Sequence, residues 1–260
     1  MTALVTGASS GIGRELAHLL ARDGHALVLV ARGSAGLADV AEELRHKYGA
    51  SVTTIPANLA IPAEIDRLLE KLRMAGTHID LLVNNAGSGS AGRFAETDLG
   101  AELGMIAVNV AAATHLTKAL LPPMLSRRKG RILNVASTAS FQPGPYMAVY
   151  YATKAYLLSF SDALAEEVQG SGVTVTTLCP GPTRTGFAAR AGMRPSRLTG
   201  GRAVMEVGPV AAAGYQGMLR GRRLVVPGLL NKLTAHGGRF LPRTLVIKAS
   251  AALNRGRAEP

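Results

Sequence analysis

Short runs rich in β-branched residues and leucine alternate with longer amphipathic segments from the start of the chain to about residue 180. The first two of these longer segments, 11–23 and 36–48, have helical length, and each ends just before a glycine. The third begins near Pro62, a residue that is tolerated in a first helical turn. Strands separated by helices form βαβ units, whose parallel sheet is covered by helices on both faces. The six strand candidates are Ala3–Thr6, Ala26–Ala31, Ser51–Pro56, Ile79–Asn84, Gly130–Ala136 and Val173–Cys179.

A seventh strand candidate, Arg223–Val226, follows an irregular stretch rich in glycine and arginine at 183–205. With it, the pattern predicts a Rossmann-like, doubly wound fold with a seven-stranded parallel sheet in a three-layer α/β/α arrangement. The 260 residues are enough for one domain with a substantial core, and neither a repeat nor a linker divides them. We therefore expect a single domain at 1–227, followed by a basic tail at 228–260.

The basic charge is confined to one part of the chain. The 29 Lys and Arg residues exceed the 17 Asp and Glu residues and give a net charge of +12, which could indicate a nucleic-acid partner. Residues 1–180 are neutral, however, whereas residues 181–260 carry 14 basic and 2 acidic side chains. That basic segment has no Trp, one Tyr and two Phe, too few aromatic rings for a base-stacking platform. We therefore expect no nucleic-acid partner.

The composition also bears on the compartment and on metal sites. The single cysteine, Cys179, cannot form an internal disulfide framework or a cysteine-rich zinc site, and we predict no metal site. A strand-like TALVTG run follows Met1 without a basic leader, so no signal peptide is expected. The apolar window without charge at 103–117 is shorter than a membrane span and contains Asn109 and His115. These features favour a soluble, cytoplasmic protein.

Glycines fill the turn between the first strand and the first helix, which reads TGASSGIG at 6–13. Glycine lets the backbone approach a pyrophosphate, whose charge is held by the N–H groups at the start of the helix. A glycine-rich turn can also be purely architectural. Its position at the first βα junction favours the binding of a nucleotide cofactor by Gly7, Ser9, Ser10, Gly11, Ile12 and Gly13.

Three further motifs lie near strand ends or on a helix. Asn84-Asn85-Ala86-Gly87 ends the fourth strand, at the sheet edge where doubly wound folds bind their ligands. Tyr150 and Lys154 are four residues apart, so a helix places both on one face. Ser137 ends the fifth strand, thirteen residues before Tyr150. Each of these motifs is weak when it is taken alone, and the tetrapeptide is an ordinary turn sequence.

Together, these motifs closely resemble the short-chain dehydrogenase/reductase family. TGASSGIG, NNAG, Asn109, Ser137 and the YxxxK motif at 150–154 occur in the order and approximate spacing of that family. The run PGPTRT at 180–185 is similar to the P-G-x-x-x-T motif of the family. The resemblance covers roughly residues 1–190, and it implies a nicotinamide-dependent enzyme that interconverts a carbonyl and an alcohol.

The resemblance implies a catalytic tetrad of Asn109, Ser137, Tyr150 and Lys154. A phenol with a pKa of about 10 acts at neutral pH only if its anion is stabilised, and the Lys154 ammonium and the oxidised nicotinamide ring would supply positive charge. Tyr150 would then transfer a proton to or from the substrate oxygen, and Ser137 would hydrogen-bond that oxygen. Lys154 would also hold the nicotinamide ribose, and Asn109 would keep a water in a proton relay. The neighbouring Tyr151 is interpreted as a packing residue, because it is only three residues from Lys154.

The end of the second strand indicates which cofactor is bound. An acidic residue there would accept hydrogen bonds from the adenine ribose and repel a 2′-phosphate. The chain has Arg32 instead, so NADP is predicted rather than NAD, although a lone arginine can also be a solvated surface residue. After the third strand, the family usually has Asp before Val or Leu, whereas this chain has Asn58-Leu59, whose amide can donate as well as accept. The resemblance adds Asn85, Ala86, Gly87, Tyr150, Lys154, Pro180, Gly181, Thr183 and Thr185 as cofactor-binding residues.

The complete tetrad predicts an NADP-dependent oxidoreductase, and the alternative is a catalytically silent NADP-binding sensor, which would not need the tetrad. The segment 183–205 is expected to form a lid over the substrate, with mobile glycines at 186, 192, 200 and 201. Apolar residues of a lid are often packing residues, but here they favour a lipophilic or bulky substrate: a 3-oxoacyl thioester, a ketone, an aldehyde or a steroid-like compound. The apolar lid candidates are Phe187, Met193, Leu198, Val204 and Met205.

The tail predicts two short amphipathic helices, broken at Gly237-Gly238 and at Pro242. They could pack on the domain with a solvated basic face. The basic stripe could instead hold an anionic membrane surface, which would make the protein peripheral to a membrane. It could also hold the phosphopantetheine group of coenzyme A or of an acyl carrier. The apolar residues are Leu229, Leu230, Leu233, Leu241, Leu245, Val246 and Leu253, and the basic ones are Lys232, Arg239, Arg243, Lys248 and Arg255.

We also expect a homodimer rather than the tetramer that is common in the family that the sequence resembles. The helices near 99–125 and 149–169 would form its interface. About thirty residues follow Val226, and they are expected to lie over or near the seventh strand, which helps form a second interface in such proteins. The small residues that permit close helix approach in the dimer are Ala111, Ala112, Ala113 and Ala155.

Overall fold

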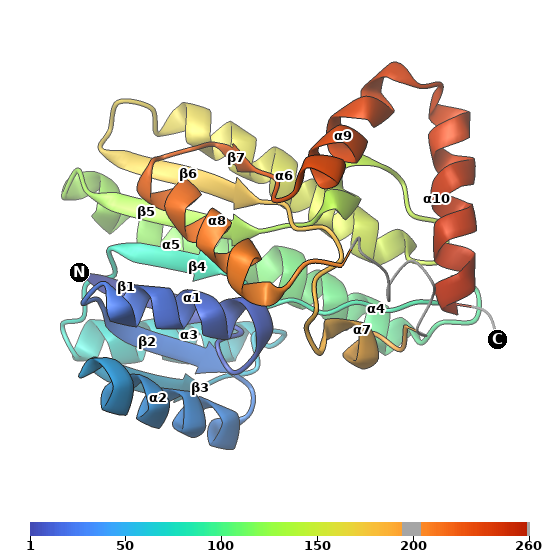
Figure 1. Cartoon of the computed structure of the whole chain (residues 1–260). Coiled ribbons are helices and arrows are strands. Elements are labelled where there is room, and N and C mark those ends of the chain that lie inside the picture. Colours follow the sequence, from blue (N-terminus) through green and yellow to red (C-terminus); the bar gives the residue numbers. More distant parts are fainter. Residues whose placement is uncertain (194–203, 259–260) are drawn as a thin grey trace.

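The computed structural model describes residues 1–193 and 204–258 and confirms the predicted fold (Figure 1). Seven strands form one parallel sheet in the order β3-β2-β1-β4-β5-β6-β7. The central neighbours β1 and β4 are separated in the sequence by two other strands, so the chain winds outward in both directions from their junction. The strands are β1 Thr2–Thr6, β2 Ala26–Ala31, β3 Val52–Pro56, β4 Leu81–Asn84, β5 Gly130–Val135, β6 Val173–Leu178 and β7 Leu224–Val225.

Helices cover both faces of this sheet. Helices α1, α2 and α8 pack on one face, and α3, α5 and α6 pack on the other. A π-helical segment, Ala107–Ala112, connects α4 to α5. The helices are α1 Gly11–Arg22, α2 Ser34–Tyr48, α3 Pro62–Met74, α4 Leu99–Ile106, α5 Ala113–Ser126, α6 Ala148–Glu167, α7 Phe187–Arg190, α8 Val207–Leu219, α9 Leu229–Gly237 and α10 Arg243–Ala258.

The central strands are largely apolar because both of their faces are buried. Val5 and Val83 point toward the layer of α1 and α8, and the alternate residues Leu4 and Leu82 point toward the layer of α3 and α5. This explains why the sequence shows continuous apolar runs there and not an alternation of apolar and polar residues. Buried polar side chains of these strands, including Asn84, Asn134, Thr176 and Thr177, lie in the carboxyl-terminal halves of their strands, toward the edge that carries the candidate site.

One continuous helical stretch, Leu99–Ser126, is long and apolar enough, by length and composition alone, to cross a membrane. It comprises α4, the π-helical segment and α5. In the structure it belongs to the layer on the sheet, because Leu116, Leu120 and Met124 pack in the core with Leu82 of β4. A core helix of this kind satisfies the same criteria as a spanning one.

Beyond β7 the chain continues outside the carboxyl ends of the strands, where α9 and α10 form a helical hairpin (Figure 1). The predicted breaks are close to the observed ones, since α9 ends at Gly237, a short 3₁₀ turn follows, and α10 starts after Pro242. Helix α9 packs through Ala235 close to Val226, next to the carboxyl end of β7. The hairpin therefore lies at the same edge of the sheet as the sequence motifs.

Candidate active site

The turn after β1 directs backbone N–H groups toward one point at the start of α1. Gly7 and Gly11 have φ angles of 64° and 56°, in the left-handed region that favours glycine. Ser10 caps α1 by position but makes no side-chain hydrogen bond to it, so the first N–H groups of the helix remain available to other partners. A Cβ atom at Gly13 would overlap the carbonyl oxygen of Gly7. The turn thus has the conformation and the room that a pyrophosphate needs.

Thr6 and Asn85 fix this turn against the end of β4. Thr6 Oγ1 donates to the Val83 carbonyl at 3.1 Å and accepts from the backbone N–H groups of Asn85 and Ala86 at 3.0 and 2.9 Å. The Asn85 amide donates to the carbonyls of Thr6 and Gly7 at 2.9 and 3.2 Å. The Asn85 side chain is therefore used to position the turn. The sequence analysis missed Thr6, although it directly precedes Gly7 at the end of a buried strand.

Asn109 and Lys154 meet beside Gly87. Asn109 is fully buried in the π-helical segment, a distortion that is frequent at functional sites. Its Nδ2 donates to the Ser88 carbonyl and to Thr153 Oγ1, both at 3.0 Å, and its Oδ1 accepts from the Ser88 N–H at 2.9 Å. A Cβ atom at Gly87 would lie 3.2 Å from Asn109 Oδ1 and 3.4 Å from Lys154 Nζ. Three segments that are distant in sequence converge at this glycine.

Lys154 carries a buried amino group. The residue is 4% exposed, and its Nζ donates to the carbonyl of Val135, the last residue of β5, at 2.9 Å. Burial lowers the pKa of the Lys154 ammonium from 10.5 to about 8. The backbone carbonyl of Lys154 accepts from Ser140 Oγ at 2.7 Å, which holds α6 against the end of β5. A buried, perturbed lysine of this kind is typical of a functional site.

Tyr150 lies one helical turn before Lys154, with its ring centroid 5.9 Å from Lys154 Nζ. The ring of Phe187 approaches it to 5.4 Å between centroids. Ser137, just after β5, accepts from the Ala139 N–H at 3.1 Å, and its own Oγ is 3.5 Å from the Pro180 carbonyl. That long contact holds the hydroxyl hydrogen of Ser137 only weakly, so it can turn toward another acceptor.

The loop after β6 lies against the glycine turn. The Pro180 carbonyl accepts from the Thr138 N–H at 2.9 Å, next to Ser137. The Thr185 methyl group is 3.2 Å from where a Cβ atom at Gly11 would lie. Thr183 forms a bridge with Met205. The predicted residues Pro180, Gly181, Thr183 and Thr185 therefore lie on the same edge as the turn and the tetrad.

The three residues predicted to contact the adenine end of the cofactor differ in exposure and in hydrogen bonding. Arg32 is exposed at the end of β2. Asn58 already makes local hydrogen bonds, because its N–H donates to Glu64 at 2.6 Å and its Oδ1 accepts from the Ala60 N–H at 3.2 Å. The side chain of Leu59 is buried in the core. Arg32 is thus the exposed, positively charged residue among these three.

In the glycine turn, the predicted residue Ser9 is half-buried and Ile12 packs partly against the core.

Part of the predicted lid contacts the tetrad. Phe187 lies against the Tyr150 ring, and Met193 packs against the buried cluster of Ala139, Met147 and Tyr151, next to the tetrad. Met205 packs against the core and Val204 is half-buried. The predicted lid residue Leu198 and the glycines at 200 and 201 lie outside the described residues.

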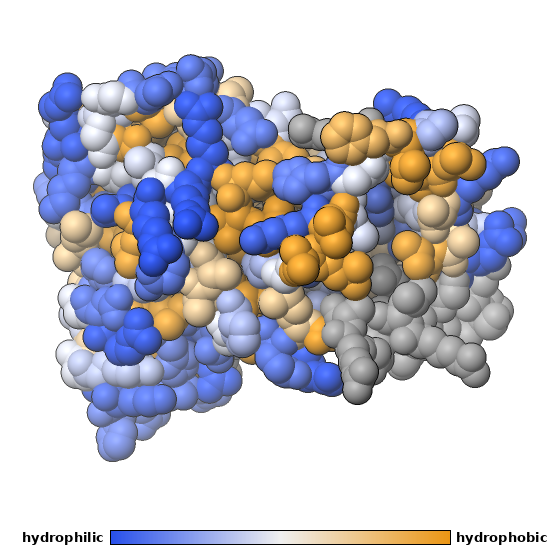
Figure 2. Space-filling model, turned by 45° about the horizontal axis from the view of Figure 1, so that its top comes forward, coloured by the Kyte–Doolittle hydropathy of each residue, from blue (hydrophilic) through white to orange (hydrophobic). Residues whose placement is uncertain are grey.

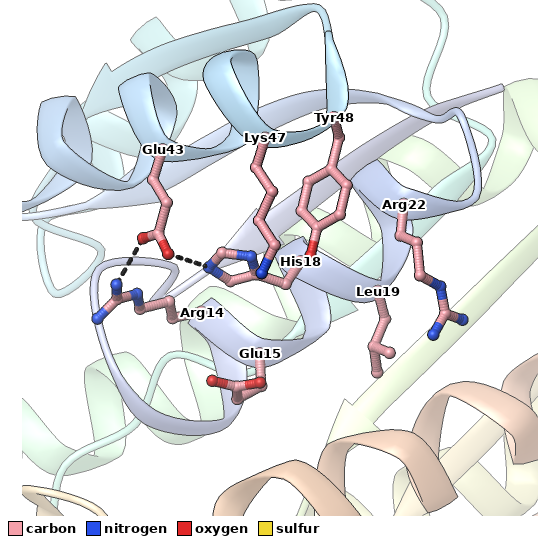
Figure 3. A pocket seen from close by; sticks show the side chains of 8 residues that line it. All are labelled: Arg14, Glu15, His18, Leu19, Arg22, Glu43, Lys47 and Tyr48. Carbon is pink, nitrogen blue, oxygen red and sulfur yellow. Dashed lines mark hydrogen bonds and ion pairs between the residues drawn. The ribbon is translucent and has the colours of Figure 1, made fainter.

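A pocket of about 320 Å³ between α1 and α2 is separate from these residues (Figure 3). The polar side chains that line it pair with one another, since Glu43 pairs with Arg14 and contacts His18, and Lys47 lies over the Tyr48 ring.

Within the described residues, no group of three or more His, Cys, Asp or Glu is arranged to hold a metal ion. Burial raises the pKa of the Cys179 thiol to about 12, so that this cysteine stays protonated at neutral pH.

Comparisons with known proteins agree with this geometry. A sequence profile for short chain dehydrogenases matches residues 1–194. The ketoacyl reductase HetN of Nostoc sp. is 34% identical over 200 residues, which are 76% of this chain and 69% of that protein. A short-chain dehydrogenase from Sphingobium yanoikuyae, solved with NADPH, is 35% identical with a TM-score of 0.82, over 92% of this chain and 90% of that one. One from Burkholderia phymatum, solved with NAD, is 26% identical with a TM-score of 0.82, over 92% and 94% of the two chains.

The buried lysine leads to a prediction about stability. Below about pH 8, folding must bury a charged ammonium, which lowers the free energy of unfolding. Between about pH 8 and pH 10.5 the folded protein loses this proton while the unfolded chain retains it, so stability rises with pH in that window. We expect Lys154→Met to raise the free energy of unfolding at pH 7 by about 1–3 kcal/mol, and the gain to shrink toward pH 10.

Urea unfolding of the protein without cofactor, at pH 7 and at pH 10, measures this difference. Lys71→Met, which changes an exposed lysine of α3, is the control and should leave the difference between the two pH values unchanged. A Lys154→Met variant that is less stable than the wild type at pH 7 would contradict the expectation.

Proposed function

The chain belongs to the short-chain dehydrogenase/reductase family, and on this premise we propose that it transfers a hydride between NADP(H) and a carbonyl or secondary alcohol of a lipophilic or bulky substrate. Its relatives include a ketoacyl reductase, and two similar short-chain dehydrogenases were solved with NADPH and with NAD. One observation carries the catalytic part of the proposal. The buried Lys154 amino group lies beside Tyr150 and Asn109, at the sheet edge where the glycine turn also opens.

The residues present fit a dinucleotide. Glycines at 7, 11 and 13 keep side chains out of the turn, and a Cβ atom at Gly13 would collide with the Gly7 carbonyl and Asn85, which hold the turn in this conformation. When bound, NADP(H) supplies or accepts the hydride. The residues that would hold it are the turn residues Gly7, Ser9, Ser10, Gly11, Ile12 and Gly13, the adenine-end residues Arg32, Asn58 and Leu59, and Asn85, Ala86, Gly87, Tyr150, Lys154, Pro180, Gly181, Thr183 and Thr185.

Proton transfer is assigned to Tyr150. The ammonium of Lys154 favours the phenolate by charge attraction, so Tyr150 can donate a proton to a carbonyl oxygen during reduction and take it back during oxidation. Ser137 donates its weakly held hydroxyl hydrogen to the same oxygen as negative charge develops there. Both amide hydrogens of Asn109 are already donated within the protein, so a relay water would need its remaining Oδ1 lone pair or its backbone.

The substrate class follows from what surrounds Tyr150. Phe187 contributes an aromatic ring beside the phenol, and Met193 packs on the same apolar cluster of Ala139, Met147 and Tyr151 as Tyr150 does. Such walls favour a lipophilic carbonyl, and the ketoacyl reductase relative supports a 3-oxoacyl thioester within that class. Ketones, aldehydes and steroid-like carbonyls belong to the same class. A screen of NADPH oxidation against these four groups identifies the substrate.

The alternative of a catalytically silent NADP sensor accounts less well for the site. A sensor would need the glycine turn and Lys154 to bind the cofactor, but it would gain nothing from the weakly held Ser137 hydroxyl, whose assigned partner is the substrate oxygen. We also propose that the enzyme works in the cytoplasm as a homodimer. Exposed apolar side chains on α4 and α6 support that interface: Leu99, Leu103, Ile106 and Tyr156. Ala112 and Ala113 were expected to line it, but they are buried in the chain's own core, because their faces of the helix turn inward.

We expect Tyr150→Phe to lower kcat by about 10²–10⁴-fold while NADPH still binds, because the ring keeps its packing and only the proton donor is lost. Turnover with the best substrate of the screen and NADPH binding by fluorescence are the two measurements. Tyr156→Phe, on the same helix, removes a hydroxyl that contacts Thr114 at 2.9 Å and serves as the control. If Tyr151→Phe lost turnover while Tyr150→Phe kept it, the proton donor would be Tyr151, and the assignment to Tyr150 would be wrong.

We expect the wild type to prefer NADPH over NADH, and Arg32→Asp to invert this preference. The new carboxylate would accept from the ribose hydroxyls and repel a 2′-phosphate. The ratio of kcat/KM for the two cofactors is the measurement, and Arg67→Asp, on the exposed side of α3, is the control. Equal kcat/KM values for both cofactors in the wild type would show that Arg32 is only a surface residue.

We expect a dimeric mass by light scattering at low concentration. Helix α9 covers the carboxyl end of β7, as the tail was expected to do. The part of β7 that α9 leaves uncovered borders a pocket of about 470 Å³ between α8 and β7. A tetramer would show that this uncovered part pairs as well and that the tail does not obstruct it.

A further inference from the structure

The C-terminal hairpin of α9 and α10 turns its large apolar side chains away from the protein. Leu229, Leu230 and Leu233 of α9 are 75%, 60% and 62% exposed. Phe240, in the connection between the helices, is 88% exposed. Leu241, Leu245 and Leu253 are also exposed, so this short segment holds seven of the exposed large hydrophobic side chains of the described chain. Isolated exposed leucines are ordinary, but a contiguous group of this size marks an interaction surface.

The face that packs on the domain is made of small and polar residues. Ala235 of α9 and Ser250 and Asn254 of α10 are buried. Asn254 donates to the Pro145 carbonyl at 3.1 Å and accepts from the Tyr151 hydroxyl at 3.2 Å. These hydrogen bonds fix the rotation of α10 about its axis. The two helices thus pack on the domain and leave Lys232, Arg243 and Lys248 exposed, as the packed-helix interpretation expected. The fully buried positions are Ala, Ser and Asn, however, so this packing leaves the large apolar side chains uncovered.

The charges on this segment are of one sign. No Asp or Glu occurs between Glu206 and Glu259, and the cations Lys232, Arg243 and Lys248 are exposed. Figure 2 shows hydrophobic side chains gathered with hydrophilic ones over this end of the molecule. A second copy seated on the same surface would bring like charges together, which opposes self-association. An anionic surface with an apolar interior satisfies both the leucines and the cations.

We propose that α9, the connection at 238–242 and the first turns of α10 form a docking surface for a bilayer that contains anionic phospholipids. The apolar side chains enter the boundary between headgroups and acyl chains, and the cations bind headgroup phosphates. The apolar residues are Leu229, Leu230, Leu233, Phe240, Leu241 and Leu245, and the cations are Lys232, Arg243 and Lys248.

The docking surface is joined to the candidate active site by two contacts. Asn231 of α9 lies against Gly181, where a Cβ atom would overlap it. Asn254 of α10 holds the loop before α6 through Pro145 and Tyr151, next to Tyr150. A docked bilayer would therefore face the edge of the sheet that carries the tetrad. Delivery of a lipophilic carbonyl compound from the bilayer rests on the proposed function, whereas the docking itself does not.

Co-sedimentation of the full-length protein with vesicles tests the docking without any turnover. We expect binding to phosphatidylcholine vesicles that contain phosphatidylglycerol at low salt, weak binding to pure phosphatidylcholine, and release at high salt. Lys232→Gln/Arg243→Gln/Lys248→Gln should weaken binding by about fivefold per cation removed. Leu229→Ser/Leu233→Ser/Phe240→Ser should weaken it by at least about tenfold.

Matched controls change the same kinds of side chain elsewhere. Ile61→Ser/Met74→Ser alters exposed apolar residues at α3, and Arg67→Gln/Lys71→Gln/Lys118→Gln alters exposed cations of α3 and α5. Both controls should bind vesicles as the wild type does. All variants should keep the wild-type thermal midpoint within a few degrees, because the changed side chains are exposed.

Three outcomes would overturn the proposal. Wild-type protein that stays in the supernatant with anionic vesicles shows that no bilayer docks. A leucine variant that binds vesicles normally but has a smaller mass by light scattering shows that a second copy covers the surface. Retention on immobilised coenzyme A that is lost with salt, without vesicle binding, shows that the cations hold a phosphopantetheine phosphate. An inactive protein that still sediments with anionic vesicles would refute only the proposed function.

Discussion

The junction of β1 and β4 is the constraint on which the site depends. These strands are adjacent in the sheet but separated by two strands in the chain. Thr6 connects them, because its Oγ1 accepts hydrogen bonds from the backbone N–H groups of Asn85 and Ala86. The Asn85 amide closes the link by donating to the carbonyls of Thr6 and Gly7. Without these hydrogen bonds, nothing described would fix the position of the glycine turn relative to Gly87. With them, the start of α1 and the Asn109–Lys154 pair share one edge.

The cost of this arrangement is concentrated at Lys154. Its amino group is buried with one described hydrogen bond, to the Val135 carbonyl, and burial lowers the pKa of the ammonium to about 8. A protein selected for stability alone would place an apolar residue there. The neighbouring π-helical segment, which turns Asn109 inward, and the weakly held hydroxyl of Ser137 are further departures from regular packing. Such departures at one sheet edge are typical of a site that is built for chemistry.

The C-terminal hairpin connects this edge to the outer surface of the molecule. It is held by polar contacts of Asn254 and by the close approach of Asn231 to Gly181, so its position does not depend on burying its leucines. Those leucines remain available to a partner. The same helices thus fix the loops around Tyr150 on one side and present apolar and basic side chains on the other.

The sequence by itself determined the kind of fold, and it predicted the candidate site residues that the structure brings to one edge of the sheet. Alternating strand and helix patterns indicate a parallel sheet, whose strands all end at the same edge. The TGASSGIG and NNAG motifs, after β1 and at the end of β4, therefore lie at one edge, and YxxxK lies on α6. Only the tertiary structure decided the strand order, the role of Thr6 and the local hydrogen bonds of Asn58. It also decided that Ala112 and Ala113 face the core while Leu229 and Leu233 face outward. The physical reason is that periodicity tells which residues share a face of a helix, but contacts between distant segments decide which face is buried.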